Sequence, residues 1–152
     1  MRRIGVISDT HGLMRPQALA ALAGCDPIIH AGDVGRPEVL DALRAIAPVY
    51  AVRGNVDVGA WARQLPETAL VEVEGWRLYV LHDRASLAVD PGVAGLRAVI
   101  AGHSHRPLIE MRDGVLHFNP GSAGPPRFRL PITVGILALA DDVLDAEIVT
   151  IG

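Results

Sequence analysis

Short apolar runs alternate with amphipathic stretches along the first third of the 152-residue chain. Three of the runs have the length of a strand and are apolar on both faces, as strands buried in a parallel sheet are: residues 4–8, 27–32 and 49–54. Between them, residues 16–24 and 37–47 carry apolar side chains at three- and four-residue spacing, which predicts two helices. Strands that alternate with helices in this way predict parallel pairing through right-handed crossovers.

The pattern changes in the second half, where apolar and polar positions alternate. This alternation predicts three hairpins: residues 68–83 turning at Glu74-Gly75, 107–121 turning at Asp113-Gly114, and 132–151 turning at Asp141-Asp142. Residues 97–102 predict one more buried strand, and residues 85–95 predict a weak helix. The expected architecture is a parallel-rich sheet from the first half and an antiparallel sheet from the hairpins, with helices outside. No repeat or linker divides the chain, so we expect one domain over residues 1–152.

Composition narrows the range of partners. Half of the residues are apolar and the net charge is −3, so no broad basic surface for nucleic acid is expected. Cys25 is the only cysteine, which excludes an internal disulfide and argues against a thiolate zinc site. The apolar runs 4–7 and 130–140 are too short for a signal peptide or a membrane span. We therefore expect a soluble cytoplasmic protein with a small-molecule partner and no membrane contact. An exposed strand edge would also permit a homo-oligomer.

Side chains that bind metals follow five of the expected strands directly, and three of them come after a glycine. They are Asp9 and His11, Asp33, Asn55, His82, and the pair His103 and His105. Taken singly, each has an ordinary interpretation, such as a turn or helix cap, or a half-buried histidine. The carboxyl ends of strands, however, meet at one edge of an open α/β sheet, where ligands collect. The shared position favours a single site over five unrelated polar residues.

The order of these motifs resembles that of the calcineurin-like metallophosphoesterases, specifically their small single-domain bacterial and archaeal phosphodiesterase branch. The similarity rests on Asp-Thr-His (9–11), Gly-Asp (32–33), Gly-Asn (54–55), His82 and Gly-His-Ser-His (102–105). The segment Asn-Pro-Gly-Ser (119–122) is also similar to a segment of that branch. The resemblance implies an α/β fold, a four-layer α/β/β/α sandwich of two mixed sheets with flanking helices. It also implies a two-metal centre at one edge.

The resemblance further implies seven ligands for two divalent transition-metal ions, with Asp33 shared between both sets. One set is Asp9, His11, Asp33 and His105, and the other is Asp33, Asn55, His82 and His103. Carboxylate, amide and imidazole ligands without thiolate suit Mn²⁺ best, while Fe, Ni or Zn would also be accepted.

The function that follows is a metal-dependent phosphodiesterase that hydrolyses a small phosphodiester through a hydroxide bridging two metals. Its expected catalytic residues are Asp9, Asp33, Asn55 and His103, and Arg127 and Asn55 are expected to contact the substrate phosphate. Two alternatives stay open. One is a phosphomonoesterase on the same centre, and the other is a non-catalytic scaffold similar to a subunit of the retromer complex. The complete ligand set argues against the scaffold.

The chain departs from the family where many relatives carry a histidine, thought to protonate the leaving group, directly after the Gly-Asn asparagine. Here that position is Val56, so a metal-bound water, Asp57 or His117 would have to substitute. We therefore expect slower hydrolysis of alkyl than of activated aryl diesters. Arg53 and Arg84 either contact phosphate as well or are ordinary solvated arginines.

Overall fold

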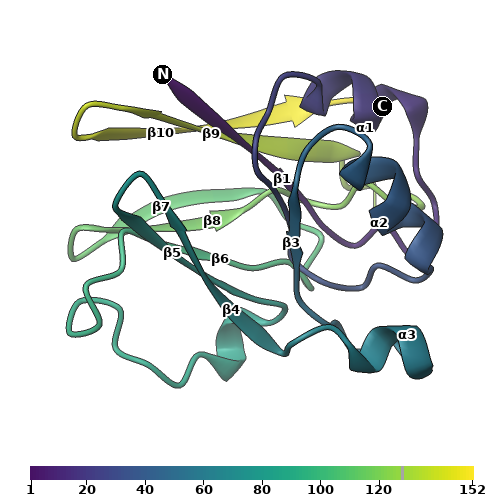
Figure 1. Ribbon diagram of the computed structural model, residues 1–152, viewed down its shortest axis with the longest axis horizontal. Coiled ribbons are helices and arrows are strands. Elements are labelled where there is room, and N and C mark those ends of the chain that lie inside the picture. The colour runs from purple at the N-terminus through teal and green to yellow at the C-terminus, as the bar shows by residue number, and fades with distance from the viewer. Residues whose placement is uncertain (128) are drawn as a thin grey trace.

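Two five-stranded sheets form the protein, and their inner faces pack against each other (Figure 1). The computed structural model describes residues 1–127 and 129–152. The first sheet has the order β10-β9-β1-β2-β3, with β1 at Arg2–Ile7, β2 at Ile28–His30, β3 at Val49–Ala51, β9 at Thr133–Ala140 and β10 at Val143–Thr150. The second has the order β4-β5-β6-β8-β7, with β4 at Thr68–Val73, β5 at Trp76–Leu81, β6 at Ala98–Ile100, β7 at Leu108–Arg112 and β8 at Val115–Asn119.

Two α-helices cover the outer face of the first sheet. Helix α1 (Pro16–Leu22) and helix α2 (Pro37–Arg44) each begin with a proline, whose fixed φ suits a first helical turn. Their buried side chains, Leu22 and Leu43 among them, pack on the side of the sheet that carries Ile28. A four-residue helix α3 (Ala60–Arg63), which the sequence pattern did not predict, places Trp61 against the same cluster.

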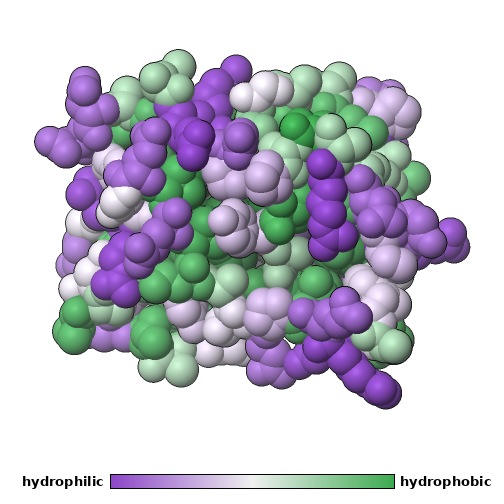
Figure 2. Space-filling model, viewed as in Figure 1, coloured by the Kyte–Doolittle hydropathy of each residue, from purple (hydrophilic) through white to green (hydrophobic). Residues whose placement is uncertain are grey.

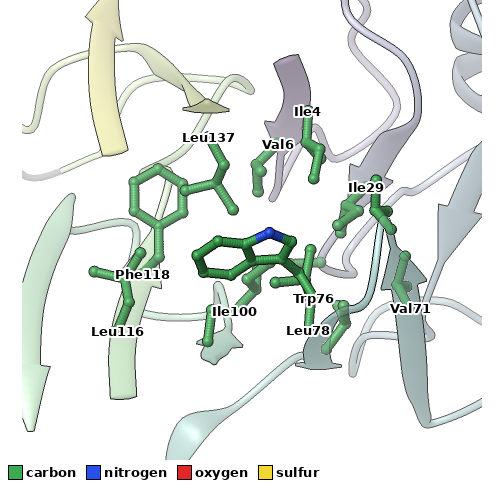
Figure 3. Close-up of a cluster of buried hydrophobic side chains, with 14 of the residues drawn as sticks. Ile4, Val6, Ile29, Val71, Trp76, Leu78, Ile100, Leu116, Phe118 and Leu137 are labelled. Atoms are coloured by element: carbon green, nitrogen blue, oxygen red, sulfur yellow. The ribbon is translucent and has the colours of Figure 1, made fainter. Parts of the chain in front are cut away.

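The core lies between the two sheets and is built from alternate residues of strands in both. Figure 3 shows the Trp76 indole at its centre, with Phe118 and Leu137 nearby. Trp76 remains only 7% exposed, so its large apolar surface is almost wholly removed from water. Burial of a side chain of this size contributes roughly 3 kcal/mol to stability.

Both sheets are mixed, which confirms the expected sandwich. The assignment of strands to the two sheets, however, differs from the one expected from the sequence. The hairpin of residues 132–151 does not join an antiparallel sheet, because β9 pairs antiparallel with β1 and β10 forms the edge beyond it. In the second sheet, β6 pairs parallel with both β5 and β8, while β4 and β7 add antiparallel edges. The expected division into a parallel-rich sheet and an antiparallel sheet from the hairpins was therefore wrong, whereas the two mixed sheets that the resemblance implied are confirmed.

The helix expected over residues 85–95 is also absent. A 3₁₀ turn, η1 (Arg84–Ser86), takes up only its start. Beyond it, the Asp90 side chain accepts hydrogen bonds from the N–H groups of Gly92 (3.0 Å) and Val93 (3.3 Å), which closes a turn instead. The outermost layer over the second sheet is consequently a loop, residues 87–97, packed through Leu87 and Leu96.

All three hairpin tips lie where the sequence pattern predicted them. In the first two, both tip residues have positive φ, as two-residue hairpin turns require: Glu74 (51°) and Gly75 (82°), and Asp113 (49°) and Gly114 (80°). Hydrophilic and hydrophobic residues are interspersed over the face drawn in Figure 2. Among the described residues, no helix is long and apolar enough to cross a bilayer.

Candidate metal centre

Residues at strand ends of both sheets converge at one place. Asp9 follows β1 and Asp33 follows β2 in the first sheet, whereas His82 follows β5 and His105 follows β6 in the second. Asp9, His11 and His105 form one group, and Asp9, Asp33 and His82 form another. Within each group, one potential ligand atom of every residue lies within 4.8 Å of the others, so each group could hold a metal ion.

The Asp9 carboxylate is held through one of its oxygens. Its Oδ2 accepts hydrogen bonds from the Ser8 hydroxyl (2.7 Å) and from the His103 N–H (3.1 Å). Its Oδ1 is buried without a hydrogen-bond partner among the described residues. That free oxygen lies 3.4 Å from Nε2 of His105 and 3.9 Å from Nε2 of both His11 and His82.

The Asp33 carboxylate follows the same arrangement. Its Oδ1 accepts a hydrogen bond from the Val56 N–H at 3.1 Å. Its Oδ2 lies 3.2 Å from Nε2 of His82 and 3.6 Å from Nε2 of His11, so it stands between two imidazoles. A carboxylate in that position is suited to bridge two cations.

One ring nitrogen of His82 is hydrogen-bonded to the backbone, and ring nitrogens of His82 and His11 have no hydrogen-bond partner among the described residues. Nδ1 of His82 bonds the Ala31 carbonyl oxygen at 2.8 Å, and because a carbonyl only accepts, this nitrogen is the donor. Nε2 of a neutral His82 then carries a lone pair. Nε2 of His82, Nε2 of His11 and Oδ1 of Asp9 are all buried without hydrogen-bond partners among the described residues. Buried polar atoms are rarely left unsatisfied, and a divalent cation would satisfy this convergent set.

The backbone is unusual at the same residues. Positive φ angles occur at five of the seven expected ligands: Asp9 (57°), His11 (48°), Asp33 (56°), His103 (70°) and His105 (62°). Residues other than glycine adopt this left-handed conformation infrequently, and such strain concentrates at functional sites. Hydrogen bonds between the loops stabilise it, including the Asp9 N–H to the Gly32 carbonyl at 3.0 Å.

Two of the glycines that precede expected ligands lie so close to neighbouring residues that a side chain would not fit. A Cβ atom on Gly54 would overlap the backbone and carboxylate of Asp33. A Cβ atom on Gly102 would overlap the Ser8 hydroxyl and stand 2.5 Å from Oδ2 of Asp9. The loops after β2 and β3, and the loops after β1 and β6, can therefore come this close only where the side chain is absent.

Burial and charge together set the protonation of the centre. Burial raises the pKa of Asp9 above its usual range, and burial lowers that of His105. Burial also opposes ionisation of Asp33, but His82 and the Val56 N–H bring the pKa of this carboxyl below its usual value. Burial would lower the pKa of His82, yet the Asp33 carboxylate beside it raises it. The Asp33 carboxylate and the His82 ring therefore each favour the charged form of the other.

The remaining expected residues lie around this cluster. Asn55 is exposed and lines a pocket of about 460 Å³ together with His82. The His103 ring centroid lies 5.2 Å from that of His82, and its Nε2 lies 3.8 Å from a carboxylate oxygen of Asp83. Arg127 is exposed, and its charge helps to lower the pKa of His105, after the larger effect of burial. His103 therefore stands beside the two groups rather than in them, and Asn55 shares a pocket with His82.

The Asn-Pro-Gly-Ser segment (119–122) forms hydrogen bonds to the loops that carry the expected ligands. Nδ2 of Asn119 donates to the Gly102 carbonyl (3.0 Å) and to the Ser104 hydroxyl (3.2 Å). The Ser122 hydroxyl donates to the carbonyl oxygen of Asp9 at 3.1 Å. The sequence marked this segment only by its similarity to the family; its hydrogen-bonding role emerges from the structure.

Asp57 also stabilises these loops through hydrogen bonds. Its carboxylate accepts hydrogen bonds from the N–H groups of Val34 (3.2 Å), Gly35 (2.8 Å) and Gly54 (2.8 Å), and so ties together the loops after β2 and β3. Both oxygens are engaged in these bonds. This argues against Asp57 as the substitute acid considered from the sequence. Arg53 and Arg84 are likewise paired, with Glu67 at 2.9 Å and Glu110 at 3.4 Å.

A buried histidine network completes the support. Nδ1 of His30 accepts from the Gly32 N–H at 3.1 Å, and its Nε2 lies 3.0 Å from the Thr10 hydroxyl. That hydroxyl donates its proton to the Val34 carbonyl at 2.8 Å, so Nε2 of His30 is the donor to Thr10. Complete burial lowers the pKa of His30 to about 3, which keeps the ring neutral.

Comparison with known proteins agrees with this site. The sequence model of the calcineurin-like phosphoesterase superfamily domain matches residues 1–142, and the chain belongs to that superfamily of metal-dependent phosphoesterases. It is 35% identical to a probable metallophosphoesterase of Methanothermobacter thermautotrophicus, over 98% of this chain and 92% of that protein. It is 31% identical to the phosphodiesterase YfcE of Escherichia coli, over 90% of this chain and 88% of YfcE.

Solved structures show the same fold. The structure of Escherichia coli YfcE superposes with a TM-score of 0.70 at 26% identity, and the match covers 99% of this chain and all of YfcE. The structure of Vps29 from Chaetomium thermophilum superposes with a TM-score of 0.79 at 20% identity, covering 99% of this chain and 98% of Vps29. The second likeness establishes a shared fold.

Proposed function

We propose that this protein is a phosphodiesterase with a dinuclear centre that acts on a small phosphodiester. One observation carries the proposal: each of two buried carboxylates is fixed through one oxygen and directs the other toward imidazole nitrogens. The proposed ligands are those that the resemblance implied, with Asp33 shared: Asp9, His11, Asp33, Asn55, His82, His103 and His105.

The donor set and the local contacts support this assignment. Oxygen and imidazole ligands without thiolate suit Mn²⁺ and related first-row ions, so Mn²⁺ is the proposed metal. When bound, two such ions would supply an activated water and positive charge at the phosphoryl oxygens. Asp9 and Asp33 are already oriented for that role. Asn55 lines a pocket with His82, and Arg127 acts on the pKa of His105, so we propose that both contact the phosphoryl group. The proposed catalytic residues are Asp9, Asp33, Asn55 and His103.

Two pockets favour a diester over a monoester. One, of about 660 Å³, is lined by His103, and the other, of about 460 Å³, is lined by Asn55. Asp83 lines both, so the pockets adjoin each other, and His82 of the candidate centre lines the second. A phosphodiester has two ester arms and would occupy both pockets, whereas a monoester would fill only one.

Substrate preference is tested with chromogenic esters. In the presence of Mn²⁺, we expect bis-p-nitrophenyl phosphate to be hydrolysed with a kcat/KM about tenfold above that of p-nitrophenyl phosphate. The reverse order would support the phosphomonoesterase. No turnover of either ester with metal bound would support the scaffold alternative, for which the fold of Vps29 is the precedent.

The bridging role of Asp33 is tested by metal content. Asp33→Ala removes the oxygen that lies between His11 and His82, so we expect both ions to be lost together and hydrolysis to fall by at least about a hundredfold. Elemental analysis after gel filtration measures the number of ions per chain. Asp145→Ala, at an exposed carboxylate of β10, is the matched control and should retain both. Retention of two ions in Asp33→Ala would show that this residue does not bridge.

A further inference from the structure

A groove runs along the outer face of the second sheet, starting at His103. A cavity of about 660 Å³ opens between η1, the loop after β6, and strands β7 and β8. A second cavity, of about 280 Å³, shares Leu87, Arg112 and His117 with it. We call these two cavities together the outer groove. It lies beside the loop that replaces the helix expected over residues 85–95.

The outer groove carries charged side chains of both signs. Three guanidinium groups line it, those of Arg84, Arg106 and Arg112, and so do the carboxylates of Asp83, Asp90 and Asp113. Glu110 accepts a hydrogen bond from Nε of Arg112 at 2.8 Å and from Nη1 of Arg84 at 3.4 Å, which holds these two side chains next to each other. A guanidinium carries five N–H donors, and Glu110 takes one from each. The pair therefore retains donors for another anion, and their fork geometry matches carboxylate and phosphate oxygens.

A buried histidine in the groove lacks a partner. His117 lies on β8 opposite Glu110 of β7, is only 6% exposed, and lines both cavities. Its Nδ1 is buried without a hydrogen-bond partner among the described residues. Burial, and then the charges of Arg84 and Arg112, lower the pKa of His117, so the ring is neutral at neutral pH. A neutral imidazole with an unsatisfied nitrogen can form a hydrogen bond with a bound ligand.

We propose that the outer groove is a subsite for one ester arm of the substrate, and that this arm carries its own anionic group, a carboxylate or a phosphate. Arg84, Arg112 and Nδ1 of His117 would bind that group, while Leu87 and Leu108 would contact the carbon skeleton that leads to it. The groove begins at His103, next to His82, so an arm bound there connects directly to a phosphoryl group at the centre. This inference rests on the proposed phosphodiesterase function and specifies its substrate class.

Matched substrates test the charge preference. The ethyl, 2-carboxyethyl and 2-phosphoethyl esters of p-nitrophenyl phosphate share one leaving group and differ only in the second arm. We expect kcat/KM to be about tenfold higher for at least one anionic arm than for the ethyl arm, and the two anionic esters distinguish carboxylate from phosphate. Equal rates for all three, or a faster ethyl ester, would overturn the subsite.

Matched variants locate the preference. Arg112→Gln should lower the ratio of anionic to ethyl kcat/KM by about fivefold, because it removes one guanidinium from the groove. Arg44→Gln removes the same charge from the exposed face of α2, outside the groove, and should leave the ratio unchanged. Equal ratios in wild type and Arg112→Gln would overturn the assignment. Since Arg112 is more than half exposed, the substitution should not impair folding.

A binding experiment separates this proposal from the enzymatic one. Phenylphosphonate is titrated into the metal-free protein in EDTA, and chemical-shift changes are followed by NMR. We expect saturable shifts at His117 that Arg112→Gln weakens and Arg44→Gln does not. Such binding without hydrolysis of any diester would refute the phosphodiesterase while supporting an anion subsite. Hydrolysis without anion preference, and no shift at His117, would refute the subsite alone.

Discussion

At the level of single residues, Asp9 and Asp33 use their two carboxylate oxygens differently. One oxygen of each is fixed by hydrogen bonds from neighbouring groups, and the other faces histidine nitrogens. This removes rotational freedom before any ligand arrives, so less conformational entropy is lost when a cation binds. Ser8 takes part in this preorganisation: it is completely buried, and its hydroxyl lies 2.7 Å from Oδ2 of Asp9 and 3.4 Å from the Gly32 carbonyl oxygen.

The contribution of this positioning can be measured with Ser8→Ala. Loss of the 2.7 Å hydrogen bond leaves Oδ2 of Asp9 held by the His103 N–H alone. Because residues behind the ligands typically account for a factor of ten or more in metal affinity, we expect Mn²⁺ to bind about tenfold more weakly. Isothermal titration calorimetry measures the change, and Thr150→Ala, at an exposed hydroxyl of β10, is the control. Unchanged affinity in Ser8→Ala would mean that this hydroxyl does not position Asp9.

Residue types and strand ends were enough to predict the cluster, since Asp9, Asp33, His82 and His105 each follow a recognisable apolar run. The hydrogen bonds that hold the ligand loops in place could not be predicted in this way. Ser122 bonds the carbonyl of a residue 113 positions earlier, and no local pattern encodes a contact between such distant segments. Only the tertiary fold brings these partners together.

At the level of elements, local sequence signals predicted the hairpins correctly, whereas the pairing between strands far apart in the sequence was not predicted correctly. Glu74-Gly75 and Asp113-Gly114 are turn sequences, and their hairpins formed as expected. In residues 85–95, by contrast, the Asp90 turn outweighed a weak helical pattern. The final hairpin was assigned to the wrong sheet because its partner, β1, lies at the opposite end of the sequence.

Strand β2 supplies an element-level test through His30, whose ring links the loops after β1 and β2. Its pKa is about 3 in the folded protein and about 6.5 when unfolded, so the unfolded chain binds the proton between these values. The contribution of the neutral ring to stability is complete above pH 6.5 and is lost as the pH falls toward 3. From this group we expect the unfolding free energy of the metal-free protein to drop by about 2 kcal/mol between pH 6.5 and pH 5.

Urea denaturation in EDTA at several pH values measures this dependence. His30→Gln removes the titrating group, so its unfolding free energy should vary less with pH over the same interval, whatever its absolute stability. If wild type and His30→Gln had parallel pH profiles, His30 would not be the group responsible.

At the level of the whole molecule, the candidate centre joins the two sheets. Asp9, His11 and Asp33 belong to loops of the first sheet, while His82 and His105 belong to the second. The apolar core already holds the sheets together along their inner faces, and a bound cation would add a link at the edge. Unlike a hydrophobic contact, this link depends on metal concentration.

Metal binding should therefore raise the melting temperature, with a stabilisation that grows as the logarithm of the metal concentration divided by the dissociation constant. At a Mn²⁺ concentration of about one hundred times the dissociation constant, the folded state gains about 2.7 kcal/mol, which corresponds to a rise of roughly 5–10 °C for a domain of this size. The rise is measured by calorimetry against the protein in EDTA. Asp33→Ala should show almost none of it, because the oxygen next to His11 and His82 is gone, whereas Asp145→Ala should show all of it. Hydrogen exchange adds the structural criterion, since amides at the ends of both β1 and β5 should gain protection together. Protection confined to one sheet would mean that the metal binds without joining the two.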